Sequence, residues 1–264
     1  MNALPASLQT APLLAVRGLH VGIGGRSFCR NLDFELRGGQ SLAIVGRNGA
    51  GKSTLLSTLA GLRPAQAGQI ELAGQTYAQL GARQSARLRG WLPQTRVDAF
   101  SATVLETALV GRHPHLERWG WEGEADARIV RAALAAVDLA ALEQRDVQSL
   151  SGGERQRLAV ATLLAQDAPL MLLDEPLAHL DLKHQIAVLD LFAAAVRRGA
   201  SVVMVLHDPA LARRYCDLAL LVDGDGHCDF GPVAERLTAE RLSQLYDYPL
   251  HALESGGHVS FVPK

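Results

Sequence analysis

The sequence predicts an α/β fold in which helices cover a mostly parallel sheet. Short buried strands are each followed by a segment with the apolar spacing of a helix. Alternating strand patterns open the chain, and a long stretch in its middle carries only helical patterns. We therefore expect one domain, residues 1–264, with an antiparallel β subdomain near its start and a helical subdomain inserted into the core.

The first predicted elements are strands. Leu13 to Val21 and Asn31 to Leu36 cluster or alternate apolar residues between glycine-rich turns, which predicts antiparallel pairing. Ser41 to Val45 is a short buried strand that runs into a glycine-rich loop, and a helix is predicted over Lys52 to Leu62. The apolar side of that helix would consist of Leu55, Leu59 and Leu62.

The strand and helix pattern recurs twice in the second half of the chain. Leu170 to Leu173 precedes a helix over 182–198, and Val202 to Leu206 precedes a helix over 211–215. Repeated units of this kind form a mostly parallel sheet with helices on its faces. A last helix is predicted near Thr238 to Tyr246.

The middle of the chain has no strand signal. We expect helices at Val104 to Val110, Asp126 to Val137 and Gly152 to Ala165, which together form the inserted helical subdomain at about 97–166. The sheet-bearing core would then comprise about 13–96 and 167–251.

The composition is typical of a globular protein. Of the 264 residues, 48% are hydrophobic and 20% are charged, and the formal net charge is −1. Such a chain can bury a sizeable core. Because it carries no overall basic field, nothing favours nucleic acid or an anionic membrane surface as a partner.

Cysteine usage and hydropathy bear on the compartment. Cys29, Cys216 and Cys228 are an odd number with no CxxC pair and no histidine at metal-ligand spacing, so we expect neither a disulfide framework nor a zinc site. Met1 to Pro12 lacks the pattern of a secretory signal, and no segment approaches the roughly 20 apolar residues of a membrane span. These features fit a reducing cytosol.

A phosphate-binding loop follows the predicted strand at Ser41. The pattern GxxxxGK[ST] lies between a strand and a helix, which predicts the core of a P-loop NTPase. Backbone N–H groups would surround the phosphates, Lys52 would reach the β- and γ-phosphates, and the Ser53 hydroxyl would bind Mg²⁺. By chance, this pattern arises in roughly one chain of this length in a hundred. The loop comprises Gly46, Arg47, Asn48, Gly49, Ala50, Gly51, Lys52, Ser53 and Thr54.

Two adjacent carboxylates end the strand that begins at Leu170. Ligands bind at the carboxyl ends of strands in parallel α/β sheets. Since alternate residues of a strand point to opposite faces, Asp174 and Glu175 are expected to differ in role. Asp174 would hold the Mg²⁺, and Glu175 would polarise the water that attacks the γ-phosphate. The alternative is a strand end with exposed acids before a proline turn.

A second anion site is predicted at the start of the helix at Gly152. Ser151 and Glu154 form a capping box, and Gly152 and Gly153 would let a phosphate approach the backbone. Because the segment lies in the helical subdomain, it can hardly reach the nucleotide that Lys52 holds. An ordinary capped helix explains Ser151 and Glu154 but not the paired glycines, so we expect a site that acts on a second copy.

From about Leu13 to His251, the chain resembles the nucleotide-binding subunit of an ABC transporter, with the Walker A, signature and Walker B motifs in the family's order. The resemblance implies that Gln94 senses Mg²⁺ and the attacking water, that Asp181 links two sites, and that His207 contacts the γ-phosphate. It also implies ATP and Mg²⁺ as ligands, a homodimer, two transmembrane permease subunits and, indirectly, a periplasmic substrate-binding protein. The chain would lie in the cytoplasm, on the inner face of the cell membrane.

Two segments are similar to a subgroup of that family. Gly111 to Leu116 and His179 to Gln185 resemble the ATPases of importers for ferric siderophores, haem and cobalamin, with a lean towards cobalamin. Other interpretations are another transporter class, a soluble ABC ATPase of DNA repair or ribosomes, and a regulatory module without hydrolysis. The soluble enzymes would need a long coiled-coil insertion or two fused cassettes. An intact Glu175 and His207 oppose the regulatory module.

The chain departs from the family at one position. Such subunits carry an aromatic residue upstream of the phosphate loop that stacks on adenine, and the aligned residue here is Ile23. We therefore expect weak recognition of the base, with most of the binding energy coming from the triphosphate and Mg²⁺.

Overall fold

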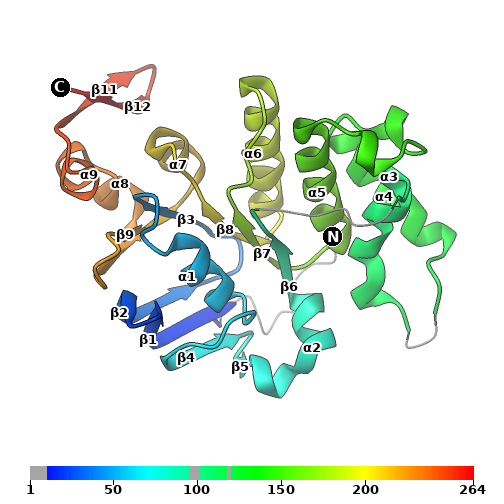
Figure 1. The fold of residues 1–264 in the computed structure, drawn as a ribbon, viewed down its shortest axis with the longest axis horizontal. Helices are drawn as coiled ribbons and strands as arrows, with labels where there is room; N and C mark the ends of the chain where they lie inside the picture. The colour runs from blue at the N-terminus through cyan, green and yellow to red at the C-terminus, as the bar shows by residue number, and fades with distance from the viewer. Residues whose placement is uncertain (1–10, 95–100, 118–119) are drawn as a thin grey trace.

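The computed structural model describes residues 11–94, 101–117 and 120–264. A six-stranded sheet forms its centre, in the order β10-β9-β3-β8-β7-β6 (Figure 1). Within the described residues, neighbouring strands pair in parallel except β9 and β10, which are antiparallel. This confirms the expected α/β fold with a mostly parallel sheet. The strands are β3 (Ser41–Gly46), β6 (Arg89–Leu92), β7 (Leu170–Asp174), β8 (Ser201–Val205), β9 (Leu218–Val222) and β10 (Cys228–Pro232).

A second, antiparallel sheet lies against the first, in the order β2-β1-β4-β5. The antiparallel pairing expected near the start of the chain is confirmed, although the second strand begins at Arg26, earlier than predicted. The strands are β1 (Leu14–Ile23), β2 (Arg26–Leu36), β4 (Ala67–Leu72) and β5 (Gln75–Thr76).

The two faces of the central sheet are covered differently, because alternate residues of a strand point to opposite sides. On β3, Leu42 and Ile44 pack into a core shared with the antiparallel sheet and with α1 (Lys52–Leu59). Ala43 and Val45 pack into the other core, which α5, α6 and α7 share. The fully buried β3 is thereby held from both sides, and so is the loop that follows it. The covering helices are α5 (Gly152–Gln166), α6 (Leu182–Arg197) and α7 (Pro209–Tyr215).

Helices dominate between β6 and β7, as the sequence predicts, and α3 and α4 stand to one side of the central sheet while α5 packs against it (Figure 1). Val97, where this subdomain was expected to begin, lies outside the described residues, as does most of the Met1 to Pro12 segment. The elements here are α3 (Val104–Leu109), η2 (Val110–His115), α4 (Glu124–Ala136), η3 (Ala140–Leu142), η4 (Val147–Ser149) and α5, while α2 (Tyr77–Leu88) precedes β6.

The structure differs from the prediction at the end of α1 and at the C-terminal end of the chain. The helix expected to reach Leu62 ends at Leu59, because the chain turns at Gly61, whose φ of 68° favours glycine, and Leu62 is 53% exposed. At the other end, α8 (Val233–Arg236) and α9 (Ala239–Tyr246) are followed by a hairpin of β11 (Leu250–Ser255) and β12 (His258–Pro263), which the sequence analysis did not anticipate. In the described part of the chain, no helix is long and apolar enough to cross a membrane.

The expectation of no disulfide is wrong. Cys29 on β2 and Cys228 on β10 form a disulfide, with Cα atoms 5.8 Å apart. A parallel bridge between Cys29 and Gly226 brings the two strands together, and the Arg30 amide donates to the Gly226 carbonyl at 2.8 Å. The pairing crosses 199 residues of sequence, so it arises from the fold and not from a local cysteine pattern. Cys216 is a buried free thiol.

We expect reduction of this disulfide to lower the free energy of unfolding by about 2–4 kcal/mol, because the bridge closes a very long loop in the unfolded chain. Denaturant unfolding with and without dithiothreitol measures the difference. Cys228→Ala is the control, since its unfolding should not respond to the reductant. Identical curves for the parent protein in both conditions would contradict a stabilising disulfide.

Candidate functional site

A cavity of about 450 Å³ opens where β3, β7 and β8 end at the same edge of the sheet. It unites residues from the predicted phosphate loop with residues that follow three other strands. The lining residues are Phe28, Asn48, Gly49, Gly51, Lys52, Ser53, Thr54, Gln94, Glu175 and His207. Predicted site residues separated by more than 150 positions therefore share one cavity.

The phosphate loop connects β3 to α1 through a left-handed turn. The residue before the helix is Gly51, with φ 92° and no side-chain cap, so the first N–H groups of α1 have no capping side chain. A Cβ atom on Gly51 would lie 2.3 Å from Cγ of Phe28, and one on Gly46 would lie 2.2 Å from the Val222 carbonyl oxygen. Both positions therefore require glycine. A helix N-terminus with free N–H groups is suited to bind an anion.

Lys52 closes this loop from inside. Its Nζ donates to the carbonyl oxygens of Gly46 and Arg47, at 2.8 Å each, and the side chain is buried. Burial lowers the pKa of Lys52, while the carboxylates of Glu175 and Asp174 oppose that shift. The ammonium group is thus held within the loop and close to two acids, where it can contact a phosphate.

Asp174 and Ser53 form a pair of oxygen donors. Ser53 Oγ donates to Asp174 Oδ1 at 3.0 Å, and Asp174 is almost fully buried at the end of β7. Burial raises the pKa of Asp174, and the hydrogen bond from Ser53 counteracts this. A hydroxyl and a carboxylate side by side are the hard oxygen ligands that Mg²⁺ takes, so these two residues fit that ion. Gln94 lines the same cavity.

Glu175 turns out of the strand towards His207. Its φ is 51°, a left-handed conformation that is strained for a glutamate. His207 Nε2 lies 2.8 Å from Glu175 Oε1. Glu175 lines the same cavity as Ser53, whose hydroxyl holds Asp174. The two acids have different partners, as expected, but the reason is that Glu175 lies beyond the end of β7 and not that the strand alternates.

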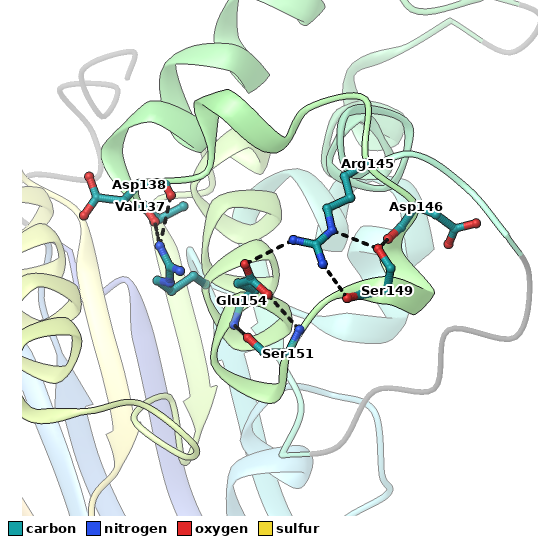
Figure 2. A network of polar contacts seen from close by, with 8 residues as sticks. Val137, Asp138, Arg145, Asp146, Ser149, Ser151 and Glu154 are labelled. Atoms are coloured by element: carbon teal, nitrogen blue, oxygen red, sulfur yellow. Dashed lines mark hydrogen bonds and ion pairs between the residues drawn. The ribbon is translucent and has the colours of Figure 1, made fainter.

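Ser151 caps α5 as the sequence predicts. Its Oγ accepts from the Glu154 amide at 3.2 Å, and a Glu154 carboxylate oxygen accepts from the Ser151 amide at 2.7 Å (Figure 2). Gly153 lies close to His179, because a Cβ atom there would be 3.1 Å from the His179 carbonyl oxygen. Of the described residues, Ser151, Gly152 and Gly153 do not line the cavity of Lys52. The structure therefore does not bring this helix N-terminus to the chain's own phosphate loop.

Arg145 stabilises the N-terminus of α5. The sequence analysis missed this role of Arg145. Its Nε and Nη2 donate to Ser149 Oγ and the Ser149 carbonyl at 2.9 Å each, and its Nη1 lies 3.6 Å from Glu154 Oε1 (Figure 2). Nearby, Arg157 Nη1 donates to the carbonyl of Val137 at 2.8 Å. Arg145 thus links the segment before Ser151 to the capping glutamate. No local motif indicates this role, since Arg145 acts across a turn.

Asp181 and Ile23 lie outside the cavity lining. Asp181 caps α6 and accepts from the His184 amide at 2.9 Å, and the hydrogen bonds from His184 lower the pKa of Asp181. Ile23 is 43% exposed at the end of β1. The aromatic residue that does line the cavity is Phe28, which sequence analysis did not single out.

Comparisons with known proteins give this site a family. A model described as ABC transporter matches residues 29–178. The chain is 42% identical over 248 residues to a hemin import ATP-binding protein of Streptomyces coelicolor, spanning 93% of this chain and 87% of that protein. It is 40% identical over 236 residues to a cobalamin import ATP-binding protein of Halobacterium salinarum, spanning 89% of this chain and 58% of that protein.

A solved structure agrees with these relatives. An inward-facing metal-chelate type ABC transporter superposes with a TM-score of 0.83 at 30% identity, covering 96% of this chain and 98% of that chain. The family model covers more than half of the chain, and the relatives span nearly all of it. The chain therefore belongs to the ABC transporter family, among its ATPase subunits.

Proposed function

We propose that this chain is the ATP-hydrolysing subunit of an importer for metal chelates. The observation that carries the proposal is the meeting of Lys52, the Ser53 and Asp174 pair, and the Glu175 and His207 pair around one cavity. A cation, a metal-binding pair and a carboxylate in contact with a histidine are the groups that phosphoryl transfer to water requires. The whole chain would form one nucleotide-binding domain, with a core at about 13–96 and 167–251 and a helical subdomain at about 97–166.

The phosphate loop would bind the triphosphate of ATP. Its N–H groups would donate to the phosphate oxygens, and Lys52 would exchange its carbonyl partners for the β- and γ-phosphates. Ser53 and Asp174, with Gln94 beside them, would hold Mg²⁺, which neutralises negative charge on the phosphates when it is bound.

Glu175 would orient and deprotonate the attacking water. The water oxygen attacks the γ-phosphorus, the bond to the β,γ-bridging oxygen breaks, and the proton passes to the Glu175 carboxylate. His207, 2.8 Å from that carboxylate, would keep it in place and reach the γ-phosphate. The products are ADP and inorganic phosphate.

A second copy of the chain would complete each site. Ser151, Gly152 and Gly153 present a capped helix N-terminus that does not face their own phosphate loop, which suits a contact with the γ-phosphate held by a partner. Asp181, at the start of α6, would connect the two sites. Two ATP molecules would then close a head-to-tail homodimer, and hydrolysis would reopen it.

At the cytoplasmic face of the membrane, closing and reopening of this homodimer would drive two membrane-spanning permease subunits. A periplasmic binding protein would deliver the cargo to these permeases. The similar proteins named for hemin and cobalamin import support the class of cargo. The chain is 42% identical to the hemin import protein and 40% identical to the cobalamin import protein, and these values differ little. We therefore propose metal chelates as the class of cargo and do not choose between hemin and cobalamin. The preference for cobalamin suggested by the two sequence segments stays a prediction.

Lys52→Ala tests the phosphate loop. We expect ATP affinity to fall by roughly 10- to 150-fold, because a charge-assisted contact worth about 1.5–3 kcal/mol is lost, and hydrolysis to stop. Equilibrium binding and phosphate release measure the two effects. Lys264→Ala is the matched control, because it removes a lysine that is remote from Lys52 in the sequence. Near-parental hydrolysis by Lys52→Ala would refute the assignment.

Glu175→Gln separates chemistry from binding. We expect hydrolysis to fall by about 10²- to 10⁴-fold while ATP still binds, because the amide keeps the shape but cannot accept the proton. With ATP and Mg²⁺, this variant should accumulate as a dimer in sedimentation experiments. Asp174→Asn should instead weaken Mg²⁺ binding and give less dimer. Parental hydrolysis by Glu175→Gln would exclude the proposed base.

Ser151→Arg tests the contact between copies. We expect the monomer to bind ATP almost as the parent does, because Ser151 is absent from the lining of its own nucleotide cavity. Hydrolysis should be abolished, since the new side chain would block the partner's γ-phosphate. If monomer binding dropped as far as in Lys52→Ala, the helix N-terminus would face its own nucleotide and the proposed dimer geometry would be wrong.

A further inference from the structure

A β-bulge places Phe28 against the phosphate loop. On the hairpin of β1 and β2, Gly22 pairs with Ser27 but Val21 pairs with Cys29, so Phe28 has no partner across the strands. Bulges redirect a side chain and are common beside active sites. The Phe28 ring packs on Gly51, leaves only 9% of the residue exposed, and contributes to the cavity lining. Phe28 is therefore a fixed apolar support under the loop.

Arg26 lies over Phe28, next to the cavity but outside its lining. Its guanidinium carbon is 5.2 Å from the centroid of the Phe28 ring, and Nη2 donates to the Gly224 carbonyl at 3.4 Å. Gly224 in turn lies against the phosphate loop, since a Cβ atom there would be 2.9 Å from Cα of Ala50. Among the described residues, the contacts of this guanidinium are a ring face and a carbonyl, not a carboxylate. Because Arg26 is exposed and the ring lies on one side of its guanidinium, the other side is open to another π system.

The strand order places Arg26 and Phe28 at one end of the phosphate loop and Glu175 and His207 at the other end. Glu175 and His207 follow β7 and β8, which lie on one side of β3 in the sheet. Gly224 follows β9, on the other side of β3. A triphosphate bound along the loop with its γ end at Glu175 has its nucleoside on the β9 side, where Arg26 lies over Phe28.

We propose that the base of the bound nucleotide stacks on the guanidinium of Arg26, which lies over the Phe28 ring. The proposal rests on the proposed function, because it takes the γ-phosphate to lie at Glu175. Ile23 pairs directly with Arg26 across the two-glycine turn and is exposed beside it, so it would contribute an apolar edge and no stacking surface. Stacking on a guanidinium uses the π face that every base has, so this surface binds purine bases without choosing between them.

Two probes distinguish the base from the phosphates. Inorganic tripolyphosphate carries the phosphates alone, and ATP carries the base as well. We expect Arg26→Ala to weaken equilibrium ATP binding by roughly 2- to 30-fold and GTP binding equally, while tripolyphosphate binding stays within about twofold. Phe28→Leu, which removes the ring but keeps an apolar side chain, should weaken ATP binding in the same direction. Arg30→Ala is the matched control, because Arg30 is an exposed arginine of the same strand that donates to Ser27 Oγ.

Several outcomes would overturn the proposal. Unchanged ATP affinity in Arg26→Ala would show that Arg26 does not contact the base. Equal losses of affinity for ATP and for tripolyphosphate would show that the charge of Arg26 acts on the phosphates. Full recovery in Arg26→Lys would exclude the planar stack, because lysine keeps the charge and loses the plane. If the proposed function itself is wrong, the parent protein and Lys52→Ala should bind ATP and tripolyphosphate equally. This result differs from the outcomes above, in which the parent protein binds both probes through Lys52.

Discussion

The hydrogen bonds from the Lys52 ammonium to the carbonyls of Gly46 and Arg47 are the interaction on which the rest of the site depends. They close the loop between β3 and α1 around a buried positive charge, and a buried charge is tolerated only when it is well paired. Asp174 and Glu175 supply the opposing charge from the neighbouring strand β7. The loop, the Ser53 and Asp174 pair and the Glu175 carboxylate are therefore parts of one electrostatic unit, and moving either acid would leave the Lys52 charge less well compensated.

The order of strands in the central sheet turns this unit into a site with two distinct ends. Strands β7 and β8 bring Glu175 and His207 to one side of the loop, and β9 brings Gly224 to the other. Packing on both faces of the sheet keeps these carboxyl ends in place, since β3, β7 and β8 are buried throughout. The end with Glu175 and His207 is polar and charged. The opposite end carries a ring and a guanidinium in contact, which is a surface for a flat ligand group.

The helical part of the chain presents a polar feature that is separate from the cavity in the core. One of its polar networks lies at the N-terminus of α5, where Ser151 and Glu154 exchange hydrogen bonds and Arg145 connects Glu154 to the preceding turn (Figure 2). This network caps the first turn of α5, where Ser151 and Gly152 are exposed. Because this N-terminus does not line the cavity of Lys52, it is free for the contact with a second copy proposed above.

The sequence by itself determined the α/β class, the phosphate loop, the acids at the end of β7 and the capped helix at Ser151, because each of these depends on a contiguous segment with its own periodicity or spacing. It could not determine that Cys29 meets Cys228, that Glu175 turns towards His207, or that Arg145 supports Glu154. Nor could it show that a bulge directs Phe28 to the cavity in place of Ile23. These features depend on strand order, on a positive φ and on contacts between segments remote in sequence, and only the packed tertiary structure decides such contacts.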